Sequence, residues 1–398
     1  MTLDATVLLT GATGFVGRMV LRDLLESTQA TVIALVRAPD DGRANARLAR
    51  VLDESVAPSA RRGLASRAVA MAADLERPNL GLSPYAGDIL AEEATHIVHA
   101  AASVRFDLPL ARARRINVEG TRSVVALARA AQARGRLQRL VSVGTAFVAG
   151  TYAGRFGEAQ LDVGQGFRNT YECSKFEAEM LLRDAMGDVP ISIVRPSIVM
   201  GHSVTGATTS FNVLYVPIRL YVSGRVRRVP VRARLPLDVV PVDFVARVVR
   251  EAALGGGRDG ATYAAVAGRR ATTAAEVAEV AAEVFGIARP RLLRAPLPPR
   301  AIGGLARLQV CRQPRARRAA MRVYLPYLVH GSRFDSSNTE ALLRDTGVTI
   351  PDSRVYLQRV MEFARATRFG GDAPAPIPRP APAPAGQRVA VNAGMRPS

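Results

Sequence analysis

The sequence predicts an α/β fold, a doubly wound parallel sheet with a smaller, mostly helical C-terminal substrate lobe. Short apolar runs alternate with longer amphipathic runs over residues 6–195, the rhythm of parallel strands joined by helices. A glycine-rich turn separates the first apolar run from the first amphipathic one. After Gly201 the alternation breaks, and residues 203–238 are irregular, basic and apolar. We therefore expect one large α/β unit and a second unit built from the segments that follow it.

The predicted elements follow from hydrophobic periodicity. Short apolar runs predict strands at residues 6–10, 31–36, 67–71, 95–99, 138–142, 191–195 and 261–267. Amphipathic runs predict helices from the glycine turn to residue 26 and at about 108–134, 170–186, 241–254 and 272–285. Residues 286–370 are expected to be mostly helical with proline breaks, and the Ala-Pro repeats from Gly371 onward predict a disordered tail. The first unit is then residues 1–202 plus about 239–270, and the second is 203–238 plus 271–370, followed by the tail 371–398.

The first turn reads Gly11-Ala-Thr-Gly14-Phe-Val-Gly17 and lies between a strand and a helix. This is the context of a dinucleotide-binding turn in a Rossmann sheet, although the spacing is GxxGxxG rather than GxGxxG. Glycine lets the backbone approach a pyrophosphate, whose charge is stabilised at the helix N-terminus. The candidate contacts of this turn are Gly11, Thr13, Gly14, Phe15 and Gly17.

The second predicted strand is followed directly by Arg37, where NAD-specific proteins usually carry an acid. Because a guanidinium suits a 2′-phosphate and a carboxylate would repel it, the sequence favours NADPH (NADP⁺) over NADH. Asp74 follows the third strand and is expected to meet the adenine edge. The small residues Ala100 and Ala101 let the backbone pass close to a ribose, or alternatively allow tight packing of a helix on the sheet.

The chain holds 54 basic residues of the lysine and arginine types. Lys175 is the one lysine, and the others are arginines. It lies four positions after Tyr171, so that both side chains share one face of a helix. A compact ammonium at this position can act on a neighbouring phenol in a way that a bulky guanidinium cannot. We expect Tyr171 to donate a proton to a carbonyl oxygen, with its pKa depressed by Lys175. Thr145 would hydrogen-bond the developing oxyanion, with Ser142 as the alternative.

Charge and cysteine content restrict the partners and the compartment. The formal charge is +20, and eleven arginines and no acid lie between Glu283 and Asp335. Such surfaces favour a phosphorylated cofactor, an acidic carrier protein or an anionic membrane face, while no signature of a nucleic-acid-binding fold accompanies the charge. Cys173 and Cys311 have no metal or redox spacing, and no signal peptide or membrane-spanning run is apparent, so we expect a cytoplasmic protein with no metal site.

Several segments together resemble the extended short-chain dehydrogenases/reductases, and more narrowly the fatty acyl-CoA reductase and thioester-reductase branch, often called male-sterility-like. They are Thr10-Gly-Ala-Thr-Gly-Phe-Val-Gly17, His99-Ala-Ala-Ala-Ser-Val-Arg-Phe106, Asn117-Val-Glu-Gly-Thr121, Tyr171-x-x-x-Lys175, Val194-Arg-Pro-Ser-Ile-Val-Met-Gly201 and Leu237-Asp-Val-Val-Pro-Val-Asp243. The resemblance covers residues 1–270 well and residues 271–370 loosely, through Arg333-Phe-Asp-Ser-Ser-Asn-Thr339.

This resemblance implies that Thr145, Tyr171 and Lys175 are the catalytic group, that Lys175 also contacts the nicotinamide ribose, and that Pro196 fixes the nicotinamide. The family segment that holds the serine or threonine usually reads Ser-Ser or Ser-Thr, whereas this chain reads Ser142-Val-Gly-Thr145. The expected activity is NADPH-dependent reduction of a fatty-acyl or related thioester, carried by CoA or by a carrier protein, to an aldehyde or alcohol.

Two other functions remain open from the sequence. The same residues could act on a ketone or hydroxyl of the 3β-hydroxysteroid or 3-oxoacyl type, or on a nucleotide-sugar. A cofactor-sensing regulator that performs no chemistry would be indifferent to Tyr171→Phe.

Overall fold

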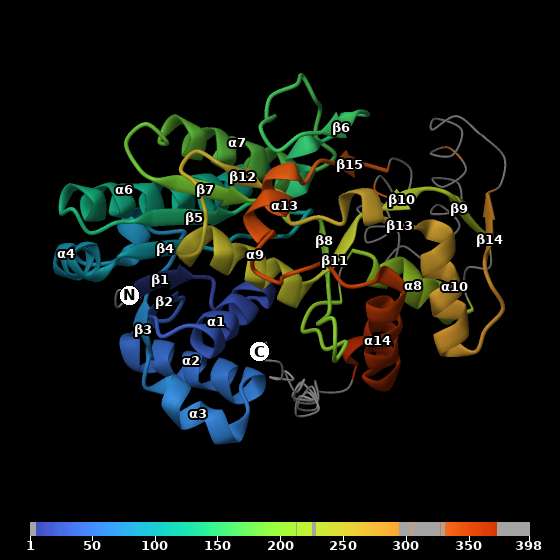
Figure 1. The fold of residues 1–398 in the computed structure, drawn as a ribbon, viewed down its shortest axis with the longest axis horizontal. Coiled ribbons are helices and arrows are strands. Elements are labelled where there is room, and N and C mark those ends of the chain that lie inside the picture. Colours follow the sequence, from blue (N-terminus) through green and yellow to red (C-terminus); the bar gives the residue numbers. More distant parts are fainter. Residues whose placement is uncertain are drawn as a thin grey trace, which may run out of the picture.

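The computed structural model describes residues 5–211, 213–224, 228–293, 304, 327 and 331–371, and is built around a seven-stranded parallel sheet (Figure 1). The strand order is β12-β7-β5-β4-β1-β2-β3. The strands are β1 (Thr6–Thr10), β2 (Thr31–Val36), β3 (Ala68–Ala72), β4 (His96–His99), β5 (Arg139–Val143), β7 (Ile191–Val194) and β12 (Thr262–Tyr263). The chain builds outward from β1 to β3 and then returns to the other side of β1 at β4. The order therefore reverses between β1 and β4, where open α/β sheets bind their ligands.

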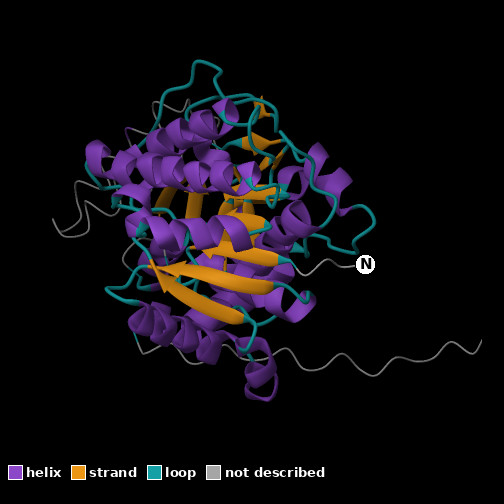
Figure 2. Cartoon of the chain, turned by 90° about the vertical axis from the view of Figure 1, so that its left-hand side faces the viewer, coloured by secondary structure: helices purple, strands orange, loops and turns teal. Residues whose placement is uncertain are grey.

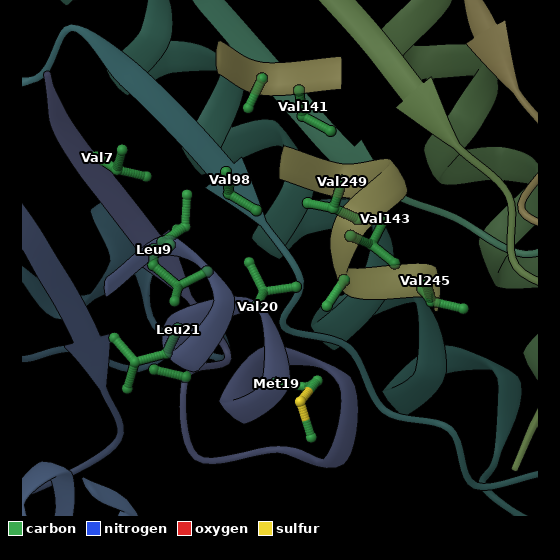
Figure 3. Packing of buried hydrophobic residues seen from close by; sticks show 14 of the residues in the cluster. Val7, Leu9, Met19, Val20, Leu21, Val98, Val141, Val143, Val245 and Val249 are labelled. Carbon is green, nitrogen blue, oxygen red and sulfur yellow. The ribbon is translucent and has the colours of Figure 1, made fainter. Parts of the chain in front are cut away.

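Helices cover both faces of this sheet (Figure 2). One face packs against α1 (Phe15–Ser27), α2 (Asp41–Ser55), α3 (Pro58–Ala65) and α9 (Val242–Leu254), and the other against α4 (Pro84–Glu93), α6 (Gly120–Ala133) and α7 (Thr170–Asp184). Alternation along β1 sorts its side chains between the two cores: Val7 and Leu9 join the cluster of α1 and α9, and Leu8 joins that of α4 and α6. Figure 3 shows Val7 and Leu9 packed near Val20 and Leu21 of α1. The predicted doubly wound sheet is confirmed.

The helix predicted at about 108–134 is interrupted in the structure. It consists of α5 (Leu110–Arg114), a π-helical turn (Arg115–Glu119) and α6. The carbonyl of Asn117 accepts a hydrogen bond from the Thr121 hydroxyl at 2.6 Å. The Asn117 side chain is buried and donates hydrogen bonds to the Ser103 carbonyl and the Ser174 hydroxyl. Such turns occur frequently at functional sites, and this one is not visible in the hydrophobic pattern.

A separate hydrophobic core lies beyond the carboxyl end of β7. It joins β8 (Ile198–Met200), β11 (Val239–Pro241), α8 (Tyr215–Val222), β9 (Arg228–Arg232), β10 (Pro236–Leu237), α10 (Ala274–Phe285) and α14 (Ser353–Ala366). Strands β8 and β11 pair in parallel, β10 pairs with β13 (Thr272–Thr273), and β9 pairs with β14 (Arg291–Leu293). Residues 203–238, expected to be irregular, therefore contain a helix and short strands. Helix α10 begins with a capping box of Thr273 and Glu276, which satisfies the free N–H groups of its first turn.

The C-terminal residues return to the main sheet. Strand β15 (Arg333–Phe334) pairs with β6 (Arg155–Phe156), and α13 (Ser337–Leu343) follows it. The buried carboxylate of Glu158 accepts hydrogen bonds from the backbone of Ala264 and from Asn338 and Thr339 at the start of α13. Within residues 286–370 the described part holds β14 and β15 as well as helices. Cys311 and the predicted tail beyond Gly371 lie outside the described residues. Among the helices that the structure describes, none is long and apolar enough to cross a membrane.

Candidate active site

The glycine turn brings the backbone of β1 against the segment that follows β4. Gly11 has φ +78°, and a Cβ built there would lie 2.7 Å from the carbonyl carbon of Ala100 and from the nitrogen of Ala101. A Cβ on Gly17 would lie 2.0 Å from the Gly11 oxygen. The N-cap of α1 is Gly14, which leaves the N–H groups of the first turn without a side-chain acceptor, and that turn carries no acid. Because these N–H groups are free to bind an anion, the turn fits a cofactor pyrophosphate.

A cavity of about 510 Å³ extends from this turn to the end of β2. Its walls include Gly11, Thr13, Gly14, Arg37, Asp74, Ala100 and Ala101. Sequence analysis missed Arg47 of α2, which lies in the same wall and donates a hydrogen bond to the Arg37 carbonyl. Two guanidinium groups therefore line one end of the cavity. Asp74 lines the same cavity, and its carboxylate accepts a hydrogen bond of 3.0 Å from the backbone N–H of Glu76.

A second cavity of about 710 Å³ continues from the first, with Gly14, Ala100 and Ala102 in both walls. It holds the remaining predicted residues: Phe15, Gly17, Thr145, Tyr171, Lys175 and Pro196. Ser142, the alternative to Thr145, is a buried residue of β5 and lines neither cavity. The structure thus brings every predicted site residue to one continuous groove over the carboxyl ends of β1, β4, β5 and β7.

Tyr171 and Lys175 are one turn apart on α7, whose N-cap Asn169 accepts a hydrogen bond from the backbone of Glu172. The Lys175 ammonium donates a hydrogen bond to the Val143 carbonyl at 2.9 Å, and its side chain is 5 % exposed. Burial lowers the pKa of Lys175 to about 8, and the nearby carboxylate of Glu179 opposes this shift.

The expected depression of the Tyr171 pKa is wrong for this structure. Burial raises it to about 12, a hydrogen bond from the Thr145 side chain lowers it, and the negative charge of Glu172 raises it further. The Lys175 ammonium donates its hydrogen bond to the Val143 carbonyl rather than to the phenol. The hydrogen bond with Thr145 nevertheless joins the two hydroxyls that the sequence assigns to the same carbonyl oxygen.

Behind Lys175, Glu179 pairs with an arginine that is completely surrounded by protein. Both nitrogens of the Arg195 fork bind Glu179, at 2.5 and 3.0 Å, and Arg195 also donates to the carbonyl of Gln160 at 2.7 Å. Its guanidinium lies 5.1 Å from the ring centroid of Phe156. A bidentate, fully hydrogen-bonded pair of this kind is the arrangement in which buried charges are tolerated.

A chain of hydrogen bonds links the turn after β4 to the π-helical turn. The Ala101 N–H donates to the Thr10 hydroxyl at 3.2 Å, and that hydroxyl lies 2.8 Å from His99 Nδ1. His99 Nε2 lies 3.1 Å from the Thr121 hydroxyl, which donates to the Asn117 carbonyl. Because Thr121 uses its proton for that carbonyl, it accepts from Nε2–H, and Nδ1 must accept from Thr10. The tautomer of His99 follows from its neighbours.

Burial and the Lys175 charge lower the pKa of His99 to about 3, so the imidazole is neutral at ordinary pH. The Asn117 side chain binds both backbone groups of Ser103 and donates to the Ser174 hydroxyl on α7 at 3.0 Å. His99 and Asn117 were quoted in sequence motifs without a role. They connect the end of β1 and the segment after β4 to α7.

Tyr327 is a second tyrosine in the wall of the larger cavity, together with Phe106 and Phe147. Sequence analysis missed it, because it lies in an arginine-rich stretch without a recognisable pattern. Cys173 lines neither cavity, and its thiol contacts Glu177 at 3.5 Å. In the part of the chain that the structure describes, no three His, Cys, Asp or Glu side chains form a metal-binding group.

The comparisons with known proteins agree with this geometry. The chain is 33 % identical over 259 residues to glycine betaine reductase of Emericella nidulans, which covers 63 % of this chain and 20 % of that protein. It is 27 % identical to a putative fatty acyl-CoA reductase of Drosophila melanogaster, over 60 % of this chain and 50 % of that one. The chain therefore spans at most about half the length of these two relatives.

Among solved structures, the terminal R domain of the myxalamid PKS-NRPS pathway superposes with a TM-score of 0.78 at 27 % identity and 92 % coverage of both chains. The reductase domain of a nonribosomal peptide synthetase from Mycobacterium tuberculosis gives 0.66 at 24 % identity, over 92 % of this chain and 93 % of that one, and shares the fold. The model of a nucleotide-binding family described as Male sterility protein matches residues 9–249. The chain belongs to the male sterility protein family.

Proposed function

We propose that this chain is an NADPH-dependent reductase of acyl thioesters. The observation that carries the proposal is the continuity of the two cavities, which brings an anion-binding turn, the Tyr171–Thr145 pair and an apolar wall into one groove. The reductase activities named for the relatives and for the superposed domains support the choice of reaction.

The residues of the chain have separate tasks in this reaction. NADPH, when bound along the groove, supplies the hydride. The hydroxyls of Tyr171 and Thr145 hold the thioester carbonyl oxygen, and Tyr171 gives it a proton as negative charge develops there. The product of these two transfers is a hemithioacetal; its carbon–sulfur bond then breaks as the hydroxyl proton passes to the sulfur, and an aldehyde and a thiol leave. A phenol whose pKa is about 12 is a poor acid at pH 7, so we assign to Lys175 the task of stabilising the phenolate that proton transfer leaves behind.

Arg37 and Arg47 support NADPH rather than NADH as the reductant. Both line the end of the smaller cavity, and the residue directly after β2, where NAD-specific proteins usually carry an acid, is Arg37. Two guanidinium groups can share the charge of a 2′-phosphate. Arg47 also donates a hydrogen bond to the Arg37 carbonyl, which joins α2 to the end of β2.

The second core supports the proposed division into a cofactor unit and a substrate unit. The segments 203–238 and 271–370 supply most of that core, and they contribute Ser210, Val213 and Tyr327 to the larger cavity. The acyl group would enter from this side. The thiol partner, CoA or a carrier protein, must then come from another molecule or another domain, as the name of the thiolation-reductase di-domain among the superposed structures suggests for that protein.

The test is loss of NADPH absorbance with purified protein on acyl-CoAs of several lengths, an aldehyde, a 3-oxoacyl ester and a sterol ketone. We expect consumption on acyl-CoA with recovery of aldehyde or alcohol. Tyr171→Phe should remove turnover and retain NADPH binding, while Tyr85→Phe, a change at a side chain 76 % exposed, should alter neither. Turnover of ketones with none of thioesters would show that the substrate is a ketone and not a thioester. Full activity of Tyr171→Phe would refute proton donation by Tyr171.

A further inference from the structure

Tyr327 reaches the start of the Tyr171 helix from a distant part of the chain. Its side chain is 7 % exposed and lines the larger cavity. Its hydroxyl donates to Glu172 Oε1 at 2.6 Å and accepts from the Asn169 amide at 2.8 Å. Glu172 is completely buried and also binds the Arg168 guanidinium at 3.1 Å. Both hydrogen-bonding directions of the Tyr327 hydroxyl are therefore used by helix α7 and its N-cap.

The hydroxyl groups of Tyr327 and Tyr171 have different hydrogen-bond partners and therefore differ in their suitability for proton transfer. The proton of Tyr327 is held against a buried carboxylate, and burial together with the charge of Glu172 raises the pKa of Tyr327 far above its ordinary value. The Tyr171 hydroxyl is instead hydrogen-bonded to a neutral threonine, Thr145. Tyr327 is thus unsuited to proton transfer, and what it offers to the cavity is the surface of its ring.

That ring is part of a fixed aromatic cluster. It stacks on Phe106 with centroids 5.6 Å apart and an interplanar angle of 25°, and meets Phe147 edge-on at 5.1 Å. Phe106 in turn lies 5.3 Å from the Tyr171 ring. The Arg168 guanidinium lies 5.4 Å from the Tyr327 centroid. Ring contacts and hydroxyl contacts hold Tyr327 from several directions. The part of its ring that lines the cavity is therefore preorganised for a ligand.

We propose that Tyr327, Phe106 and Phe147 form an aromatic wall that binds the uncharged, apolar part of the acyl group. Within this wall, Tyr327 gives the protein its preference for a long acyl group over a short one. This inference rests on the proposed function, because it places the wall beside the carbonyl held by Tyr171. The remaining side chains on the substrate side of the cavity are mostly apolar, among them Ile198, Val199 and Val213. Such surfaces stabilise hydrocarbon in proportion to the area removed from water.

The experiment compares two non-reducible probes, the thioethers S-octyl-CoA and S-ethyl-CoA, by calorimetric titration of the NADP⁺-saturated protein. We expect Tyr327→Ala to reduce the ratio of octyl to ethyl affinity by about tenfold or more. Tyr327→Phe keeps the ring and should retain that ratio within about threefold. Tyr356→Phe, which removes a buried hydroxyl bonded to the Val239 carbonyl outside both cavities, is the matched control. It should leave the ratio unchanged.

Phe106→Leu is a second variant of the same wall, and it should also lower the ratio of octyl to ethyl affinity. It keeps the proposal testable if Tyr327→Ala fails to fold. Binding of the thioethers is measured without turnover, so it distinguishes the two proposals. If the wild-type protein is inactive but prefers the octyl probe, and Tyr327→Ala loses that preference, the proposed reductase activity is overturned and the aromatic wall is supported. An unchanged ratio in folded Tyr327→Ala and Phe106→Leu proteins would overturn the wall, whatever the activity.

Discussion

Lys175→Met should stabilise the fold at pH 7 and remove turnover. The pKa of Lys175 is lowered from 10.5 to about 8 because the ammonium is buried. Keeping it charged at pH 7 therefore costs about 3 kcal/mol of the free energy of unfolding. Methionine fills a similar volume without the charge, but it loses the hydrogen bond to the Val143 carbonyl, worth about 1 kcal/mol. The variant should be more stable by about 2 kcal/mol.

The difference in the free energy of unfolding between Lys175→Met and the wild type should depend on pH in a defined direction. Below pH 8 both the folded and the unfolded wild-type chain carry the proton, and the difference between wild type and variant is constant. Between pH 8 and 10.5 the unfolded chain binds more protons than the folded chain, so wild-type stability rises with pH. The advantage of the variant should therefore shrink by about 1.4 kcal/mol per pH unit above pH 8 and be close to zero near pH 9.5.

Urea denaturation of both proteins at pH 6.5, 7.5, 8.5 and 9.5, with NADPH turnover on an accepted substrate in parallel, would measure these effects. Arg62→Met is the matched control, since it removes one positive charge from an exposed site of α3 and should change stability by less than about 0.5 kcal/mol at every pH. A Lys175→Met protein that is less stable than wild type at pH 7, or a difference without slope above pH 8, would refute the reasoning.

Three further changes test other parts of the groove and its support. Arg37→Ala should raise the Kd for NADPH about tenfold or more and leave that for NADH nearly unchanged, as titration calorimetry would show. Arg195→Met removes the buried bidentate partner of Glu179 and leaves it the more exposed Arg183, and should lower the free energy of unfolding in urea by about 3 kcal/mol, with partial recovery in the double variant with Glu179→Gln. Gly17→Ala places a methyl group 2.0 Å from a backbone oxygen of the turn and should weaken NADPH binding at least about tenfold, whereas Gly87→Ala in α4, where a Cβ meets nothing within 4 Å, should not.

Local pattern was enough to predict the sheet and the helix that carries Tyr171 and Lys175. Apolar runs bounded by turn residues lie within two residues of the observed strands at the centre of the sheet. The helix predicted at 170–186 spans Thr170–Asp184. The thirteen predicted site residues all line the groove, because the carboxyl ends of parallel strands meet at one edge of a sheet.

The remaining features depend on contacts between distant segments. Tyr327 contacts Asn169 and Glu172 across more than 150 residues of chain, and β15 pairs with β6 across a similar distance. No short-range pattern encodes such pairings. The Tyr171 pKa also required the structure, because the i, i+4 spacing brings Lys175 to the same helix face without showing that its ammonium binds Val143.

The hydrogen-bond chain through His99 has a consequence for how this protein can vary. Each donor from the Ala101 N–H to the Thr121 hydroxyl has one acceptor, so the chain has a single direction. Serine can replace Thr10 or Thr121 without reversing it. Valine at position 10 would remove the proton that His99 Nδ1 accepts and the oxygen that the Ala101 N–H needs, which leaves a buried ring nitrogen and a half-buried N–H unpaired at once. Substitutions at these positions are therefore expected to be epistatic: a change that is neutral in one background is harmful in another, and drift at one position is constrained by the others.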